Sequence, residues 1–177
     1  MVQREFALEI EWRPFLLRPE APEEGWELPP NIKAMMKSPQ NPLRARAKAL
    51  GLVMREDRTR IPSSRRAHEA TEYARSKGKQ DAFHHSILRR YWSDGEDLHE
   101  WSTLRAAAVE AGLDADELQA EVGAGKWRPA VEAFLREASQ QQVSSVPMFV
   151  FNDRYAVPGA QSAETFRQVF KKLGAST

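Results

Sequence analysis

Apolar and polar residues alternate near the start of the chain. Between Phe6 and Trp12, apolar residues are separated by polar or small ones, which is the period of two of a half-buried strand. Pro14 ends this predicted strand, residues 6–12. The stretch that follows is rich in proline and acidic residues and predicts an exposed loop.

From about residue 41 the apolar positions follow the 3.6-residue period of helices. Two of the predicted helices begin with carboxylate pairs that resemble capping boxes, Asp97 with Glu100 and Asp114 with Glu117. Glycines end most of these segments. We predict helices over residues 41–51, 63–78, 81–94, 97–112, 114–123, 126–141 and 162–174.

Two short strands, about 147–151 and 154–157, are predicted before the last helix. The first is entered through an X-Pro bond, and Asn152-Asp153 predicts a tight turn between them. The predicted order is therefore a strand, a long helical insert, a hairpin and a helix.

Length and composition set broad limits. A chain of 177 residues fits one domain with an inserted subdomain. No run of about 18 apolar residues is present, and the first residues lack the apolar core of a signal peptide, so we expect a cytoplasmic protein. The chain contains no cysteine, which excludes thiolate chemistry by these residues alone.

The net charge of +1 is unevenly distributed. Residues 1–32 contain seven acidic and three basic residues, whereas residues 33–66 contain ten basic and two acidic residues. The basic segment could attract anions, acidic peptides or nucleic acid, or it could be a solvated helix face. No aromatic residue lies between Trp26 and Tyr73, which argues against nucleic acid.

The histidines do not predict a metal site. His84 and His85 are adjacent, so on a helix they point in different directions. His68 precedes Glu72 by one turn, a spacing that metal sites can use, but a surface or capping role is favoured.

Five short pieces of the sequence, taken in order, resemble one family. They are EWRPFLL at residues 11–17, RRAHEA at 65–70, AGLD at 111–114, VPMFV at 146–150 and GAQ at 159–161. Together they resemble the DsbA-like thioredoxin family, in the branch of FrnE and the 2-hydroxychromene-2-carboxylate isomerases.

The resemblance implies an α/β fold, with a thioredoxin-like core and an all-α insertion subdomain. The core would contain residues 1–29 and 143–177, and the insertion residues 30–142. In this family the first strand and its helix carry a C-x-x-C pair, or a serine in the isomerases. Neither has a counterpart in these 177 residues, so the core is expected to be incomplete and no catalytic residue is predicted.

The resemblance also implies a substrate groove at Ser145, Val146, Pro147 and Met148, with a cis Val146–Pro147 bond that directs backbone groups towards an extended peptide. The residues alone would also allow Pro147 to start a strand in trans. Ser145 and Gln142 stand where the family usually has glycine, which narrows the groove, whereas Met148 is adaptable.

Gly159, Ala160 and Gln161 precede the last helix and could bind an anion, as related folds hold glutathione, or could only form a tight turn. Glutathione is the one cofactor that the resemblance suggests.

Two functions follow as hypotheses. The first is a thiol–disulfide oxidoreductase-like protein that is inactive alone or is completed by another segment. The alternative is a non-catalytic module that binds a peptide or a partner through the proline groove. The resemblance implies a peptide or protein thiol substrate, and neither a membrane nor nucleic acid is expected as a partner.

The absent strand would leave open strand edges, which recruit other strands. The remaining strands could pair with each other, a homodimer could form, a separate chain could supply the strand, or the sequence could be a fragment of a longer protein.

Overall fold

The computed structural model describes residues 5–38, 41–55 and 57–175. The chain divides into two compact units: one contains residues 1–17 with 134–177, and the other residues 18–133. The helix α7, Arg128–Gln140, runs across the boundary between these ranges.

The predicted division of the chain was a core of residues 1–29 and 143–177 with an insertion of residues 30–142. The compact units differ from it by short segments at each boundary. A compact unit and an inserted subdomain are different properties of a chain, so the predicted division stays a prediction.

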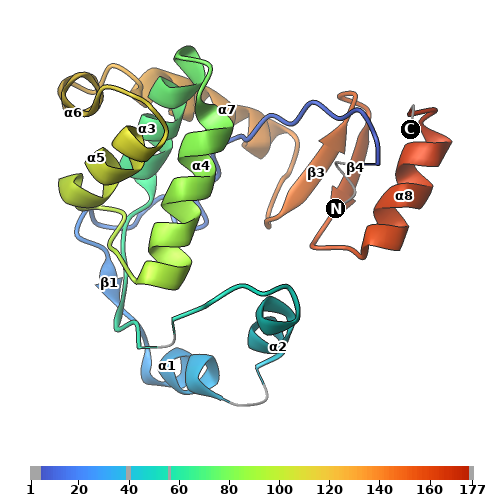
Figure 1. The fold of residues 1–177 in the computed structure, drawn as a ribbon, viewed down its shortest axis with the longest axis horizontal. Helices are drawn as coiled ribbons and strands as arrows, with labels where there is room; N and C mark the ends of the chain where they lie inside the picture. Colours follow the sequence, from blue (N-terminus) through green and yellow to red (C-terminus); the bar gives the residue numbers. More distant parts are fainter. Residues whose placement is uncertain (1–4, 39–40, 56, 176–177) are drawn as a thin grey trace. The chain divides into compact units, whose positions relative to one another are not determined.

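The second unit is built around a helical core (Figure 1). Its largest fully buried side chains include Tyr73, Phe83, Leu104 and Leu118, which come from four successive helices. Those helices are α3, Arg65–Ser76; α4, Gln80–Arg89; α5, Trp101–Glu110; and α6, Ala115–Gly123. A π-helical turn, Arg90–Asp94, continues α4. The helices predicted for the insert are therefore present. In the described residues no helix is both long and apolar enough to cross a membrane.

Only one of the two predicted capping boxes caps its helix. The Asp114 carboxylate accepts hydrogen bonds from the N–H groups of Asp116 and Glu117, both at 2.9 Å, and α6 starts there as predicted. The Asp97 carboxylate instead accepts from the His99 N–H at 2.8 Å, and α5 begins later, at Trp101. The predicted start of that helix at residue 97 is wrong, because Asp97 closes a turn before it.

The second unit also contains a long excursion that starts and ends at a short two-stranded stem. The strands β1, Trp26–Glu27, and β2, Arg60–Ile61, pair antiparallel, with Trp26 opposite Ile61. Gly25 precedes the stem with a φ of +74°, and a Cβ there would lie 2.1 Å from the carbonyl oxygen of Ile61. Only glycine fits this close approach of two backbones.

Two short helices lie within this excursion: α1, Pro30–Lys37, and α2, Pro42–Ala49. Both start with proline at the first helical position. An N–H at that position makes no intrahelical hydrogen bond, so proline, which lacks the N–H, fits there. The sequence predicted α2 but not α1, because the prolines before residue 31 read as loop signals.

In the first unit, a hairpin is packed against the C-terminal helix. The strands β3, Met148–Phe151, and β4, Tyr155–Pro158, pair antiparallel, and α8, Ala163–Lys172, follows. Phenylalanine rings make its small core, with centroid separations of 4.8 Å between Phe149 and Phe166 and 5.1 Å between Phe6 and Phe170. The two predicted strands and the last predicted helix are confirmed.

The strand predicted at residues 6–12 is wrong. Residues 8–16 form neither helix nor strand, and among the described residues β3 pairs only with β4. The alternation shows only in part in burial: Phe6 is buried and Ala7 and Glu9 are exposed, but Ile10 is 43% exposed. A strand needs a hydrogen-bonded neighbour, and no other strand pairs with this segment among the described residues. Direct pairing of this segment with the hairpin is not seen in the part of the chain that the structure describes.

Candidate proline-hairpin site

The hairpin that carries the predicted groove turns tightly. Phe151 lies opposite Tyr155, and the turn residues Asn152 and Asp153 have φ values of 50° and 52°. Asn and Asp adopt this left-handed region more readily than other non-glycine residues, because their short polar side chains bond locally. The predicted turn is confirmed, and it fixes the register of both strands.

The structure brings the two predicted site segments together. The Val146–Pro147 bond is cis, as the family resemblance implied. The Gly159 N–H donates to the Pro147 carbonyl at 2.8 Å, and Met148 lies opposite Pro158. The predicted groove residues and the predicted anion-binding residues are therefore neighbours at the open end of the hairpin.

The predicted groove residues are accessible. Ser145, Val146 and Pro147 are exposed, and Met148 is half-buried. Their contact with a substrate stays a prediction.

The segment before α8 is an internally bonded turn. The Gln161 N–H donates to the Gly159 carbonyl at 3.0 Å, and its side-chain amide donates to the Pro158 carbonyl at 2.7 Å. The Ser162 hydroxyl accepts from the Thr165 N–H at 3.1 Å and caps the helix. Ala160 is exposed beside them. Anion or glutathione binding at residues 159–161 stays a prediction.

The strand β3 has one edge without a partner strand among the described residues. The bond between Gly159 and Pro147 marks a hydrogen-bonded pair, and such pairs alternate along an antiparallel ladder. Phe149 and Phe151 therefore direct their backbone groups to β4, whereas Met148 and Val150 direct theirs to the free edge. Val150 is 48% exposed. This edge can accept a further strand.

A hollow of about 420 Å³ lies beside the end of β3. It is lined by residues 7–9, by residues 150–152 and by the end of α8, including Phe170 and Leu173. Glu9 carries the only formal charge among the lining side chains.

The described residues around this hollow offer no group for redox or metal chemistry. The sequence has no cysteine, and no cluster of three or more His, Asp or Glu residues that could hold a metal is found in the described part of the chain.

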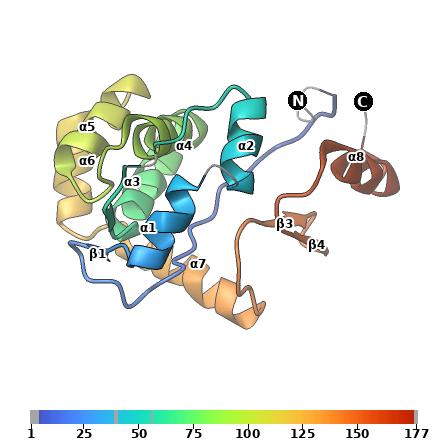
Figure 2. The ribbon, with the colours of Figure 1, turned by 90° about the horizontal axis from the view of Figure 1, so that it is seen from below.

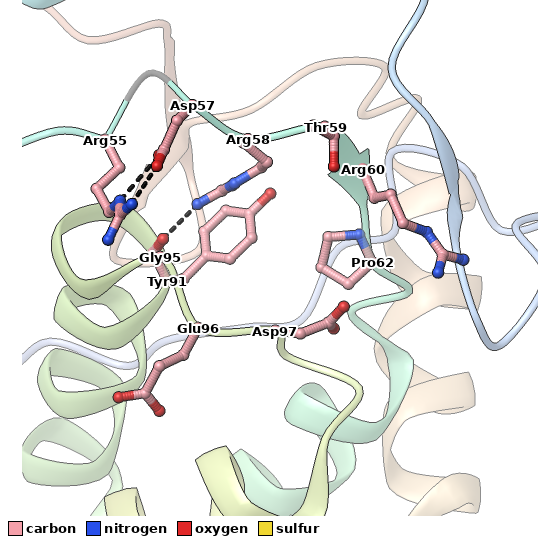
Figure 3. Close-up of a pocket in the computed structure, with 10 residues that line it drawn as sticks. All are labelled: Arg55, Asp57, Arg58, Thr59, Arg60, Pro62, Tyr91, Gly95, Glu96 and Asp97. Carbon is pink, nitrogen blue, oxygen red and sulfur yellow. Dashed lines mark hydrogen bonds and ion pairs between the residues drawn. The ribbon is translucent and has the colours of Figure 1, made fainter.

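A second hollow, of about 280 Å³, lies in the helical unit beside the stem (Figure 3). The Arg58 guanidinium lies 3.4 Å from the centroid of the Tyr91 ring and also donates to the Tyr91 carbonyl. Burial lowers the pKa of Arg58 and raises the pKa of Tyr91. The basic run that contains Arg58 is visible in the sequence, but this pocket was not predicted. Tyr91 lies 33 residues from Arg58 along the chain, so no local pattern connects them.

The charged groups of this second pocket are paired within the protein. The Arg55 Nε donates to Asp57 at 2.8 Å, and Arg60 donates to the carbonyl of Glu24 at 2.7 Å. The Glu96 carboxylate accepts from Arg90 at 2.8 Å. Because these groups are already hydrogen-bonded within the protein, the pocket is a weaker candidate for ligand binding than the hairpin.

Comparison with known proteins agrees with the fold. The sequence profile of the DSBA-like thioredoxin domain matches residues 1–171. A crystal structure of a probable DsbA oxidoreductase from Streptomyces coelicolor superposes with a TM-score of 0.79 and 29% sequence identity, covering 93% of this chain and 75% of that chain.

Two curated proteins are also similar. The uncharacterized protein YwbO of Bacillus subtilis is 22% identical over 164 residues, which are 91% of this chain and 80% of YwbO. A 2-hydroxychromene-2-carboxylate isomerase of Sphingobium xenophagum is 33% identical over 89 residues, 48% of this chain and 44% of the isomerase.

The relatives from Streptomyces coelicolor and Sphingobium xenophagum are both named as enzymes. The alternative of a non-catalytic binding module therefore has no support from them. The predicted α/β thioredoxin-like class and the predicted family are both confirmed. The chain belongs to the family of proteins with a DSBA-like thioredoxin domain.

Proposed function

We propose that this chain is the cysteine-free part of a thiol–disulfide oxidoreductase, and that it acts when a segment carrying a strand and a C-x-x-C helix pairs with β3. The single observation that carries the proposal is the free edge of β3, where Met148 and Val150 direct their backbone groups away from β4. The hollow at the end of β3 supports it, because an added strand would need room for its side chains there.

The chemistry would reside in the added segment. Its dithiol would attack a disulfide of the substrate, pass through a mixed disulfide, and end as a disulfide while the substrate leaves as a dithiol. Two electrons and two protons move from the segment to the substrate. The exposed residues Ser145, Val146 and Pro147 would lie beside the reacting sulfurs and contact the substrate backbone.

An insulin-reduction assay tests the proposal. The chain alone should show no thiol-dependent turnover, because it has no cysteine. A fusion that adds the corresponding N-terminal segment of the Streptomyces coelicolor relative should reduce insulin. The same fusion with both added cysteines changed to serine is the control and should be inactive. Equal activity of the chain alone and the fusion would contradict the proposal.

A substitution on the free edge tests the pairing itself. Val150→Pro removes an N–H that faces the free edge and leaves the bonds to β4 in place. In the fusion this change should lower turnover by several-fold or more, since one backbone hydrogen bond is worth about 1 kcal/mol and the proline ring also blocks approach. Val150→Thr keeps the N–H and should retain most of the activity. Equal turnover of the Pro and Thr variants would refute pairing at this edge.

A further inference from the structure

The excursion from the stem carries an unusual combination of charge and exposed apolar side chains. We call residues 30–55 the basic arm; they contain six basic residues and no acidic residue. In Figure 1 its helices α1 and α2 are displaced from the bundle of α3–α6, and Figure 2 shows the same two helices from below. Neither helix packs extensively against another described helix or strand.

Large apolar residues of the basic arm face solvent. Five of them are more than half exposed, the most exposed being Val53 at 67%. The five are Met35, Leu43, Leu50, Leu52 and Val53. On α2 and its end, Leu43, Ala47 and Leu50 follow one helix face, yet only Ala47 is buried. A concentration of exposed apolar groups on one short segment marks an interaction surface more often than chance exposure does.

We infer that the basic arm is the contact surface for a second copy of this chain. The same unit carries a counterpart of opposite charge in residues 19–29, which contain four glutamates and no basic residue. Glu20 and Glu24 are exposed there. In a two-fold pairing the arm of each copy would meet the acidic segment of the other, so one patch serves both subunits. This inference does not depend on the proposed redox function.

Size and composition favour a protein partner over other acidic partners. The basic arm has 26 residues, which matches the roughly 20–30 residues that each partner contributes to a standard interface. It contains no Trp, Tyr or Phe, the residues that anchor segments at lipid surfaces or stack on nucleic-acid bases. Leucine and methionine are adaptable packing groups for another protein surface.

Sedimentation velocity of the 177-residue chain across a concentration series tests the inference. The wild-type protein should form dimers that weaken as salt rises, because exposed charges are screened. Leu50→Glu with Leu52→Glu should weaken dimerisation by about tenfold or more. Val109→Glu is the matched control: Val109 is equally exposed, but it lies on α5. Dimerisation of the Val109 variant should equal that of the wild type.

A charge swap identifies the partner. One variant reverses the arm, Lys37→Glu with Lys48→Glu, and a second reverses the acidic segment, Glu20→Lys with Glu24→Lys. Each alone should be monomeric, because like charges would meet in its own dimer. An equimolar mixture should form heterodimers, since both contacts are then complementary. All four positions are exposed, so circular dichroism should show unchanged helix content.

Three results would overturn the inference. They are a wild-type protein that is monomeric throughout the series, a dimer that neither pair of reversals weakens, and a mixture that fails to associate. Co-sedimentation of monomers with phosphatidylserine vesicles, in the absence of dimers, would assign the arm to a lipid surface instead.

Discussion

Phe170→Ala should destabilise the hairpin unit while leaving the helical unit unchanged. Phe170 is 6% exposed, and its ring lies 5.1 Å from Phe6 and 5.3 Å from Phe151 between centroids. The neighbouring ring of Phe166 is 6.4 Å away. Truncation would therefore remove the residue that joins the start of the chain, β3 and α8.

The structure also sets the expected magnitude. Removing a buried phenylalanine typically destabilises a protein by about 3–5 kcal/mol. Phe170 lines the hollow beside β3, so its surroundings can relax into the space left behind. The lower end, about 3 kcal/mol, is therefore expected, and it corresponds to a roughly hundredfold change in the opening equilibrium. The small unit has few other buried side chains to compensate.

Hydrogen exchange followed by mass spectrometry measures the opening equilibrium of each unit separately. Amides of β3, β4 and α8 should exchange roughly a hundredfold faster in Phe170→Ala. Amides of α3 should be unchanged, because the buried cluster of the helical unit contains only residues between Ala67 and Val122. Phe83→Ala is the reciprocal control and should accelerate α3 and α4 but not α8. Equal acceleration of both units by either variant would refute the reasoning.

Three further changes test single contacts by thermal unfolding. Gly25→Ala should lower the Tm far more than Gly78→Ala. Both glycines have a positive φ, but only a Cβ at Gly25 would clash with the Ile61 carbonyl. Equal losses of Tm would contradict this explanation. Ser162→Ala should cost about 1 kcal/mol by removing the cap of α8, and Ser162→Asp should not. Burial lowers the pKa of His84 to about 4 from 6.5, so its contribution to stability is complete above pH 6.5 and falls as pH drops towards 4. His84→Gln should flatten that slope, and an unchanged slope would exclude His84 as its cause.

The residue pattern near the start of the chain predicted burial only in part and backbone pairing wrongly. Phe6 is buried and Ala7 and Glu9 are exposed, as a period of two requires, but Ile10 is 43% exposed. The pattern indicates which side chains can face the core. A ladder also depends on a neighbouring backbone, and no local sequence signal reveals whether that neighbour is present.

Helices with clear capping residues or a terminal glycine were predicted from the sequence. Asp114 caps α6, and the stop at Gly78 ends α3, because these contacts lie within a few residues of each other. Helix α1 was missed because its prolines occupy a first turn, where they are compatible with helix but read as loop. The π-helical turn at Arg90–Asp94 has no sequence signal that we recognised.

In the candidate site, too, features with a local sequence signal were predicted from the residues and the others were not. Asn152 and Asp153 predicted their own turn, whereas the cis bond before Pro147 followed from the family resemblance and not from the residues. The bond from Gly159 to Pro147 joins two segments that were predicted separately as a groove and as an anion site. The two bonded residues are far apart in the sequence, and no local signal at either one predicts that contact.

The outer edge of β3 and residues 8–16 share one property: neither is hydrogen-bonded to a further strand among the described residues. That segment is tied to helices on both sides: the carboxylate of Glu5 bonds Arg167 at 2.6 Å, and Arg13 bonds Glu137 at 2.8 Å. Arg13 also lies over the Phe134 ring. In the proposed function one added strand would lie between this segment and β3, which would then be about 10 Å apart, twice the strand spacing. The contacts of Glu5 and Arg13 join this part of the chain to α8 and α7, and β3 pairs only with β4 among the described residues, so its outer edge could take such a strand.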